Sequence, residues 1–368
     1  MNDFKIPFYA RAALIFVAAY AFIYALYISQ TIIVPIIYAT IIAITLNPLV
    51  NFLINKKVNK IVAISVAVLL VFVLTACLIY VVSNQVSIFT ETYPKLQAKI
   101  KTANTQGIQW ISQHFNVKIE SINTWIQENE DTAFKDIGLA AGRALLSISS
   151  SFIVLFLLPV YLFMILYYKP LLISFIHQLF KTKDQSAVVE VLNGTKTIIQ
   201  SYLGGLMIEA AVIAILNSVG LLILGIDYAI ILGITGALLN VIPYIGGVIA
   251  IALPMIIAFV SKDTLTYPLL VLGVYLLIQF IDNHFIIPRV VASKVKINAL
   301  ISVIVVIVGG SLWGVAGMFL SIPLTAIMKV VFDHIDILKP WGFLLGNIVP
   351  SATKYSFIKA KTRAVSKS

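Results

Sequence analysis

The sequence predicts an all-α polytopic membrane protein, and three observations carry this prediction. Only 11% of the 368 residues are charged, whereas a soluble domain carries about 25%. Hydrophobic residues make up 60% of the chain, and its mean hydropathy is +1.01. Uncharged runs are long: residues 12–55 hold no charged side chain. That run is long enough for two helices across a hydrocarbon layer of about 30 Å.

The uncharged runs divide into eight hydrophobic segments, of which we expect six to be full membrane spans. The first two lie within residues 12–55 and are joined by a turn near Ser29. The last two segments, 228–261 and 297–328, are each broken in the middle. The other four full spans are expected at residues 61–90, 144–168, 197–224 and 264–281.

The two broken segments are the most informative part of the chain. Residues 228–261 hold Pro243-Tyr244-Ile245-Gly246-Gly247 at their centre, and residues 297–328 hold Gly309-Gly310-Ser311-Leu312-Trp313-Gly314. Each half forms roughly 20 Å of helix, which is too short to cross the membrane alone. Each segment is therefore either one overlong kinked helix or a re-entrant hairpin, which enters and leaves the membrane on one side. Interrupted membrane helices are the best sequence indicator of a transporter's binding site.

Composition divides the chain into five parts. Residues 91–143 hold six acidic and six basic side chains, with apolar residues at helical spacing. We expect this segment to form amphipathic helices on the extracytoplasmic side. A second polar stretch, 180–196, predicts a short cytoplasmic helix. The parts are a scaffold of membrane helices (1–90), the extracytoplasmic segment (91–143), a span with the cytoplasmic helix (144–196), a transport unit with both broken hairpins (197–332) and a basic cytoplasmic tail (333–368).

Positive charge predicts which loops face the cytoplasm, because lysine and arginine are enriched there. Lys5 and Arg11 place the N-terminus inside, and the basic tail places the C-terminus inside. If both broken segments cross fully, Arg289, Lys294 and Lys296 fall outside. If both are re-entrant, these three cations fall inside. We therefore favour two hairpins that enter from opposite faces, with tips that approach each other near the middle of the membrane.

The residues at the two breaks are candidates for substrate binding and gating. Proline removes a backbone donor and glycine permits conformations that other residues avoid, so freed backbone groups are available to a polar solute. At the first break the alternative is a plain kink. At the second it is close helix packing, since Gly310 and Gly314 form a small-xxx-small pair. The candidates are Asn240, Pro243, Tyr244, Gly246, Gly247, Gly309, Gly310 and Gly314.

Three polar residues inside or beside apolar spans are candidates for coupling transport to an ion. They are Glu209, Asp282 and Asn283. A carboxylate in such a position is costly unless it faces a cavity or a partner. The structural alternatives for Glu209 are a hydrogen bond with Asn217 or with another helix. Those for Asp282 are an ion pair with Arg289 or a position at the membrane interface.

Other functional classes lack support in the sequence. No Walker-type phosphate loop and no hydrolase motif occurs, so we expect neither enzyme activity nor a cofactor. The net charge of +11 is spread over loops, which favours cytoplasmic loops over nucleic-acid binding. The expected partners are the lipid bilayer and a small-molecule or ion substrate. No metal site is expected, because metal-ligand spacing is absent among the histidines His114, His177, His284 and His334.

Short motifs in the last third of the chain resemble those of the autoinducer-2 exporter family of bacterial membrane proteins. Pro288, Gly317 and Pro323 belong to these motifs and are expected to have structural roles. Glu209 departs from the family's pattern, so the resemblance leaves the coupling ion open. The motifs are Asn240-Val241-Ile242-Pro243-Tyr244-Ile245-Gly246, Asp282-Asn283-His284-Phe285-Ile286-Ile287-Pro288, Gly309-Gly310-Ser311-Leu312-Trp313-Gly314-Val315-Ala316-Gly317 and Ser321-Ile322-Pro323-Leu324.

The resemblance implies a gradient-driven exporter of a small quorum-sensing molecule in the bacterial inner membrane. It also implies a homo-oligomer, with a pentamer as the expected form. Broken hairpins favour alternating access as the mechanism. Some members of the family are sodium/proton antiporters, which is the first alternative. A passive channel and a non-transporting membrane assembly protein are further alternatives.

Overall fold

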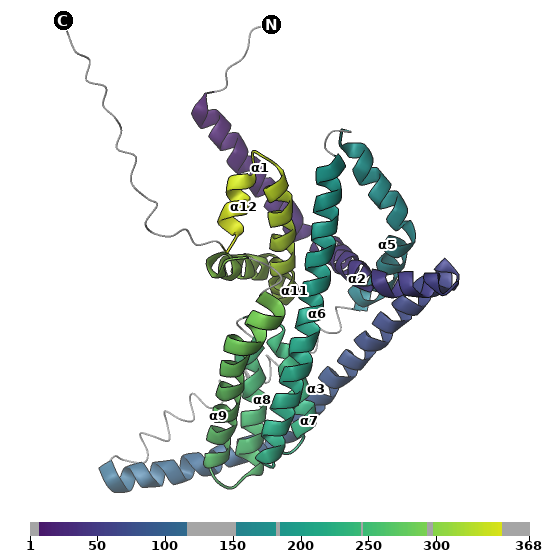
Figure 1. The fold of residues 1–368 in the computed structure, drawn as a ribbon. Helices are drawn as coiled ribbons and strands as arrows, with labels where there is room; N and C mark the ends of the chain where they lie inside the picture. Colours follow the sequence, from purple (N-terminus) through teal and green to yellow (C-terminus); the bar gives the residue numbers. More distant parts are fainter. Residues whose placement is uncertain (1–6, 116–151, 182–184, 244–245, 293–296, 348–368) are drawn as a thin grey trace, which may run out of the picture.

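A computed structural model describes residues 7–115, 152–181, 185–243, 246–292 and 297–347 (Figure 1). Helices dominate these ranges, as the apolar sequence predicts. Two π-helical turns, η2 and η3, follow α9. The elements are α1 (Phe8–Ile28), α2 (Gln30–Asn55), α3 (Lys60–Phe115), α5 (Phe152–Leu179), α6 (Gln185–Ile223), α7 (Ala229–Asn240), α8 (Gly246–Ser261), α9 (Thr266–Ile281), η2 (Asp282–Ile286), η3 (Pro288–Ala292), α11 (Ala299–His334) and α12 (Lys339–Leu345).

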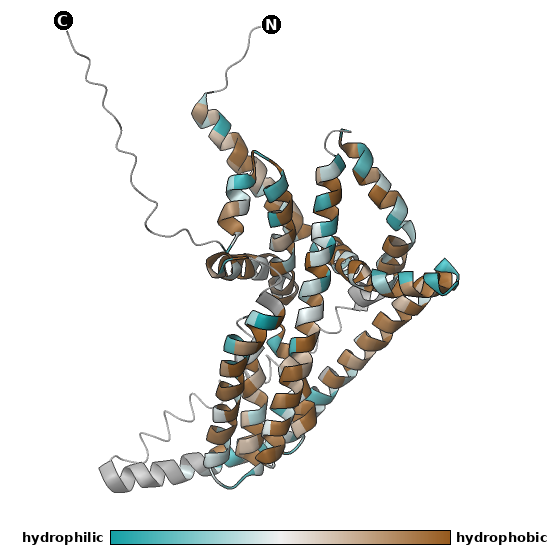
Figure 2. Ribbon diagram, in the orientation of Figure 1, coloured by the Kyte–Doolittle hydropathy of each residue, from teal (hydrophilic) through white to brown (hydrophobic). Residues whose placement is uncertain are grey.

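Seven helices in the described part of the chain are long and apolar enough to cross a membrane. One of them, α11, is interrupted at Trp313 and Gly314. Six unbroken spans and two broken segments therefore remain, and the predicted all-α polytopic fold class is confirmed. Figure 2 shows that hydrophobic residues make up most of the length of these helices, which is typical of helices that span a membrane.

The N-terminal helices form a loose group. α2, α3 and α5 share a core that includes Ala43, Ile64 and Leu162. α1 ends at Ile28 and α2 begins after Ser29, so the break lies where the sequence predicts it. α1 itself has no buried residue.

The polar segment expected at residues 91–143 does not begin as a separate unit. α3 runs without interruption from Lys60 to Phe115 and carries Pro94 in its interior. Lys99 Nζ, on this extension, donates to the carbonyls of Val260 and Lys262 at the end of α8. The apolar residues keep their helical spacing past position 90, and the helix continues through Pro94 although proline more often kinks or ends a helix. Residues 116–143 lie outside the described ranges.

Two further boundaries differ from the prediction. The fourth span was expected at 144–168, but α5 continues past Lys169 to Leu179. Lys169 is accommodated because its Nζ donates to Asn47 Oδ1 at 2.8 Å. The short helix expected at 180–196 is instead the first part of α6, which continues unbroken through the fifth span.

The first broken segment is a helical hairpin. α7 and α8 pack on each other and, with α6 and α9, enclose a core that includes Leu221, Leu232 and Val271. α8 begins at Gly246, where a Cβ atom would overlap the backbone carbonyl of Leu239. Glycine is therefore required for this close turn. Figure 1 shows α6 to α9 running side by side.

The second broken segment also reverses direction. Trp313 has φ −133° and ψ 20°, and Gly314 has φ 59° and ψ −142°, which interrupts α11. A Cβ built on Gly309 would lie 2.5 Å from the Gly317 carbonyl oxygen. These two residues would be about 12 Å apart along a straight helix. The two halves of α11 therefore fold back on each other, and small residues line their contact.

The base of this second hairpin is tied to the C-terminal helix. Asn298 Oδ1 accepts a hydrogen bond from the backbone of Ile301 at 2.9 Å and so caps α11. Its Nδ2 donates to the carbonyls of Leu344 at 2.7 Å and Gly346 at 3.0 Å. One side chain thus fixes both the start of α11 and the position of α12.

Candidate transport cavity

A cavity of about 640 Å³ lies between α6, the first hairpin tip, the α9–η2 junction and the base of the second hairpin. We call it the transport cavity. Its lining is largely apolar, with a few polar groups from each wall, which is typical of sites for small ligands. The polar lining residues are Tyr202, Glu209, Asn240, Gln279, Asp282, Asn283 and Ser302.

One face of α6 supplies the first wall. Tyr202, Leu206 and Glu209 stand at positions i, i+4 and i+7 and all line the cavity. Residues at this spacing lie above one another on the same side of a helix. Glu209 is 6% exposed, so its carboxyl group faces the cavity from a buried position.

The end of α9 supplies the opposite wall. Gln279 and Asp282 lie three residues apart, and the α-helix widens into the π-helical turn η2 at Asp282. Such π-helical turns are rare and are often found at functional sites. Asp282 is fully buried, and its Oδ2 accepts a hydrogen bond from Asn240 Nδ2 at 2.9 Å. Its Oδ1 has no partner among the described residues.

The charged lining of the transport cavity is acidic. Glu209 and Asp282 both face it, and its lining contains no lysine, arginine or histidine from the described ranges. Buried like charges are costly unless a proton or a cation offsets them. The cavity is therefore suited to a proton, a cation or a solute with hydrogen-bond donors.

The structure brings most of the sequence-predicted site residues together. Glu209, Asn240, Pro243, Gly247, Asp282 and Asn283 all line the transport cavity. Gly246 is buried in the turn itself. Tyr244 lies outside the described residues. Glu209 does not form the alternative hydrogen bond with Asn217. The two residues are eight positions apart on α6, which is about 12 Å along the helix.

The second break is placed elsewhere, so the expectation that the two tips meet is wrong for the described residues. Gly309, Gly310 and Gly314 do not line the cavity. Instead, Trp313 Nε1 donates to the Leu26 carbonyl at 3.1 Å, so this tip lies against α1. Residues at the base of the second hairpin face the first tip instead, namely Ile297, Ala299, Ser302 and Ile322.

The predicted structural residues have separate positions. Gly317 packs against Gly309 within the second hairpin. Pro323 is buried inside α11, and Pro288 is the first residue of η3. Gly309 and Gly317 thus allow the two halves of α11 to pack closely together.

Sequence reasoning missed Tyr202, Gln279 and Ser302 as lining residues. A signal was present for two of them. Gln279 is a polar residue in an apolar span, three positions before Asp282, and Tyr202 lies seven positions before Glu209. Both spacings put the pair on one helix face. Ser302 had no such signal, because it lies in α11, which holds neither Glu209 nor Asp282.

Long apolar helices, two helical hairpins and an acidic cavity between them define a multi-span membrane protein of the kind that includes secondary transporters. Residues 14–337 match the family described as AI-2E family transporter. The chain belongs to this family, and the resemblance seen in its motifs is confirmed.

Three relatives illustrate the likeness. The chain is 24% identical to the putative permease PerM of Escherichia coli K12 over 67% of this chain and 66% of PerM. It is 34% identical to the AI-2 transport protein TqsA of the same strain over 30% of this chain and 32% of TqsA. It is 28% identical to the putative transport protein YrrI of Bacillus subtilis over 36% of this chain and 37% of YrrI. The chain thus spans about a third of the length of YrrI and TqsA.

Proposed function

We propose that this protein exports a small polar molecule similar to autoinducer-2 across the bacterial inner membrane, driven by an ion gradient. The observation that carries the proposal is the transport cavity, with two buried carboxyl groups between the first hairpin tip and the base of the second hairpin. Its volume of about 640 Å³ suits a small solute, since ligand pockets range from about 300 to 1,000 Å³. The likeness to TqsA over 30% of the chain supports this choice of substrate.

Alternating access requires one wall of the cavity to move relative to another. The hydrogen bond from Asn240 to Asp282 joins the first hairpin tip to the opposite wall. A hydrogen bond to a carboxylate is roughly twice as strong as one between neutral groups. Protonation of Asp282 therefore loosens the tip, and loss of the proton holds it closed.

We further propose that the two hairpins enter the membrane from opposite faces, with both termini in the cytoplasm. The positive charge of Lys294 and Lys296 supports this topology. Single cysteines at these two positions, in a Cys77→Ser background, are expected to react with a membrane-impermeant maleimide only after the cytoplasmic side is opened. Labelling from the outside of intact cells alone refutes the arrangement.

A sodium/proton antiporter is the second candidate, and the acidic lining of the cavity favours it. The test is to reconstitute the purified protein in liposomes and measure both autoinducer-2 efflux and sodium-driven proton movement. Gradient-dependent autoinducer-2 flux supports the exporter. Sodium-driven proton movement without autoinducer-2 flux assigns the antiporter. Autoinducer-2 flux that needs no ion gradient assigns a channel. If folded protein moves neither species, both transport proposals fail.

We also propose that the protein assembles as a homo-oligomer, with a pentamer as the expected form, through its N-terminal helices. α1 supports this because it is apolar and has no buried residue within the chain. The mass of the detergent-solubilised protein measures the subunit number. A monomer at all concentrations contradicts the proposal and assigns the exposed face of α1 to lipid.

A further inference from the structure

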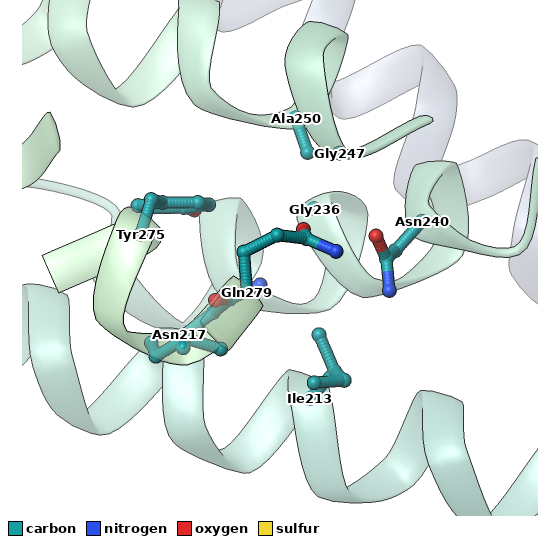
Figure 3. Close-up of a pocket in the computed structure, with 9 residues that line it drawn as sticks. Ile213, Asn217, Gly236, Asn240, Gly247, Ala250, Tyr275 and Gln279 are labelled. Atoms are coloured by element: carbon teal, nitrogen blue, oxygen red, sulfur yellow. The ribbon is translucent and has the colours of Figure 1, made fainter. Parts of the chain in front are cut away.

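A second, much smaller chamber shares part of its wall with the transport cavity, and Figure 3 shows the residues that line this chamber. Its volume is about 10 Å³, which is room for one water-sized body. Its wall includes Asn217 on α6 and Tyr275 on α9. Asn240, Gly247 and Gln279 line both spaces. Figure 3 shows Gln279 between Asn240 on one side and Asn217 and Tyr275 on the other.

Two buried polar groups of this chamber are unpartnered. Asn217 is 2% exposed and Tyr275 is 4% exposed, and neither Asn217 Oδ1 nor Tyr275 Oη has a hydrogen-bond partner among the described residues. The two side chains meet over Gly236. A Cβ atom there would lie 3.1 Å from Asn217 Nδ2 and 3.2 Å from Tyr275 Oη. A buried polar atom without a partner is costly, so a bound species that contacts both is favoured.

The opposite side of the chamber adds two more oxygen atoms. A Cβ built on Gly247 would lie 2.6 Å from Gln279 Oε1 and 3.3 Å from Asn240 Oδ1. Asn240 donates through Nδ2 to the carboxylate of Asp282, which leaves its Oδ1 on the Gly247 side. This charge-assisted bond makes the Asn240 oxygen a stronger acceptor.

These features favour a cation over a water molecule. A water molecule donates only two hydrogens and so cannot satisfy three amide oxygens at once, whereas a cation can be bound by all three and by a lone pair of the Tyr275 hydroxyl. α7 ends at Asn240, so the negative end of its helix dipole lies beside the chamber. In transporters with broken helices, such helix ends and unwound backbone carbonyls hold the coupling cation.

We propose that this chamber binds one dehydrated monovalent cation of the size of Na⁺, held by Asn217, Tyr275, Gln279 and Asn240. The inference deepens the proposed function, because it adds a cation site beside the two carboxyl groups of the transport cavity and separates that site from the site of the solute. Gln279 and Asn240 face both spaces, so an ion in the chamber changes the wall that the solute contacts. The ion also acts on the first hairpin tip through Asn240.

Equilibrium ion binding tests this proposal independently of transport. The purified full-length protein is titrated with NaCl, with choline chloride holding the ionic strength constant, and thermal unfolding and ²²Na⁺ binding are both measured. Saturable binding and a rise in melting temperature are expected, with a weaker response to K⁺. Tyr275→Phe removes only the unpartnered hydroxyl and is expected to weaken Na⁺ binding at least about tenfold.

Two matched variants sharpen the test. Tyr267→Phe makes the same change on α9 away from the chamber and is expected to leave Na⁺ binding unchanged. Gly236→Ala places a methyl group against Asn217 and Tyr275 and is expected to abolish binding by filling the space. Absence of ²²Na⁺ binding to the folded wild-type protein means that the chamber holds water and overturns the inference. Equal binding by wild-type, Tyr275→Phe and Gly236→Ala also overturns it, even if autoinducer-2 flux is observed.

Discussion

Replacing Gly317 with alanine is expected to cost the protein much of its folded population. The new Cβ atom would overlap the backbone carbonyl of Gly309 and lie 3.0 Å from the Trp313 side chain. A backbone carbonyl inside a helix cannot rotate away as a flexible side chain can, so the two halves of α11 must separate. Overpacking of a core typically costs about 1–3 kcal/mol, and we expect at least about 3 kcal/mol here because the backbone must move. Total stabilities of about 5–15 kcal/mol leave little margin.

Yield of monodisperse protein and melting temperature in detergent measure this effect. Gly273→Ala and Gly204→Ala are the matched controls, because a Cβ atom at either position meets no other atom within 4 Å. Both controls lie in helices, where alanine is favoured over glycine by about 1 kcal/mol. A Gly317→Ala protein as stable as these controls would show that the second hairpin does not close as described.

The Glu209→Gln variant is expected to fold normally and to lose gradient-driven transport. Glutamine has nearly the same shape as glutamate, so the wall of the transport cavity keeps its packing. The variant cannot carry a negative charge or exchange a proton at this position. Because a positioned proton-transfer group typically contributes a factor of about 10² to 10⁴ in rate, we expect at least a roughly 100-fold fall in coupled flux.

Flux into liposomes at several imposed proton gradients measures this loss. Glu190→Gln is the matched control, since Glu190 lies on the same helix, outside the cavity, and its carboxylate is 3.3 Å from His334 Nε2. Its flux is expected to equal that of the wild-type protein. If Glu209→Gln retains both the flux and its dependence on pH, Glu209 has no part in coupling.

The sequence by itself determined the fold class and most of the chemistry. Long uncharged runs required membrane helices, because so much apolar surface cannot be left in water. Proline and glycine at 243–247 and glycine at 309–314 marked both reversals of the chain, since these residues relieve or permit non-helical backbone. Glu209 and Asp282 stood out because buried charge in an apolar span is costly without a function or a partner.

Only the tertiary structure decided which of these residues share a site. Helical spacing tells which residues lie on one face of one helix, but it does not tell which helix that face meets. The first hairpin tip thus faces the base of the second hairpin, and the close contact of Gly309 with Gly317 leaves the second tip against α1. Asn217, Tyr275 and Gln279 converge for the same reason. Contacts between segments distant in the chain follow from packing the whole molecule, and no local pattern records them.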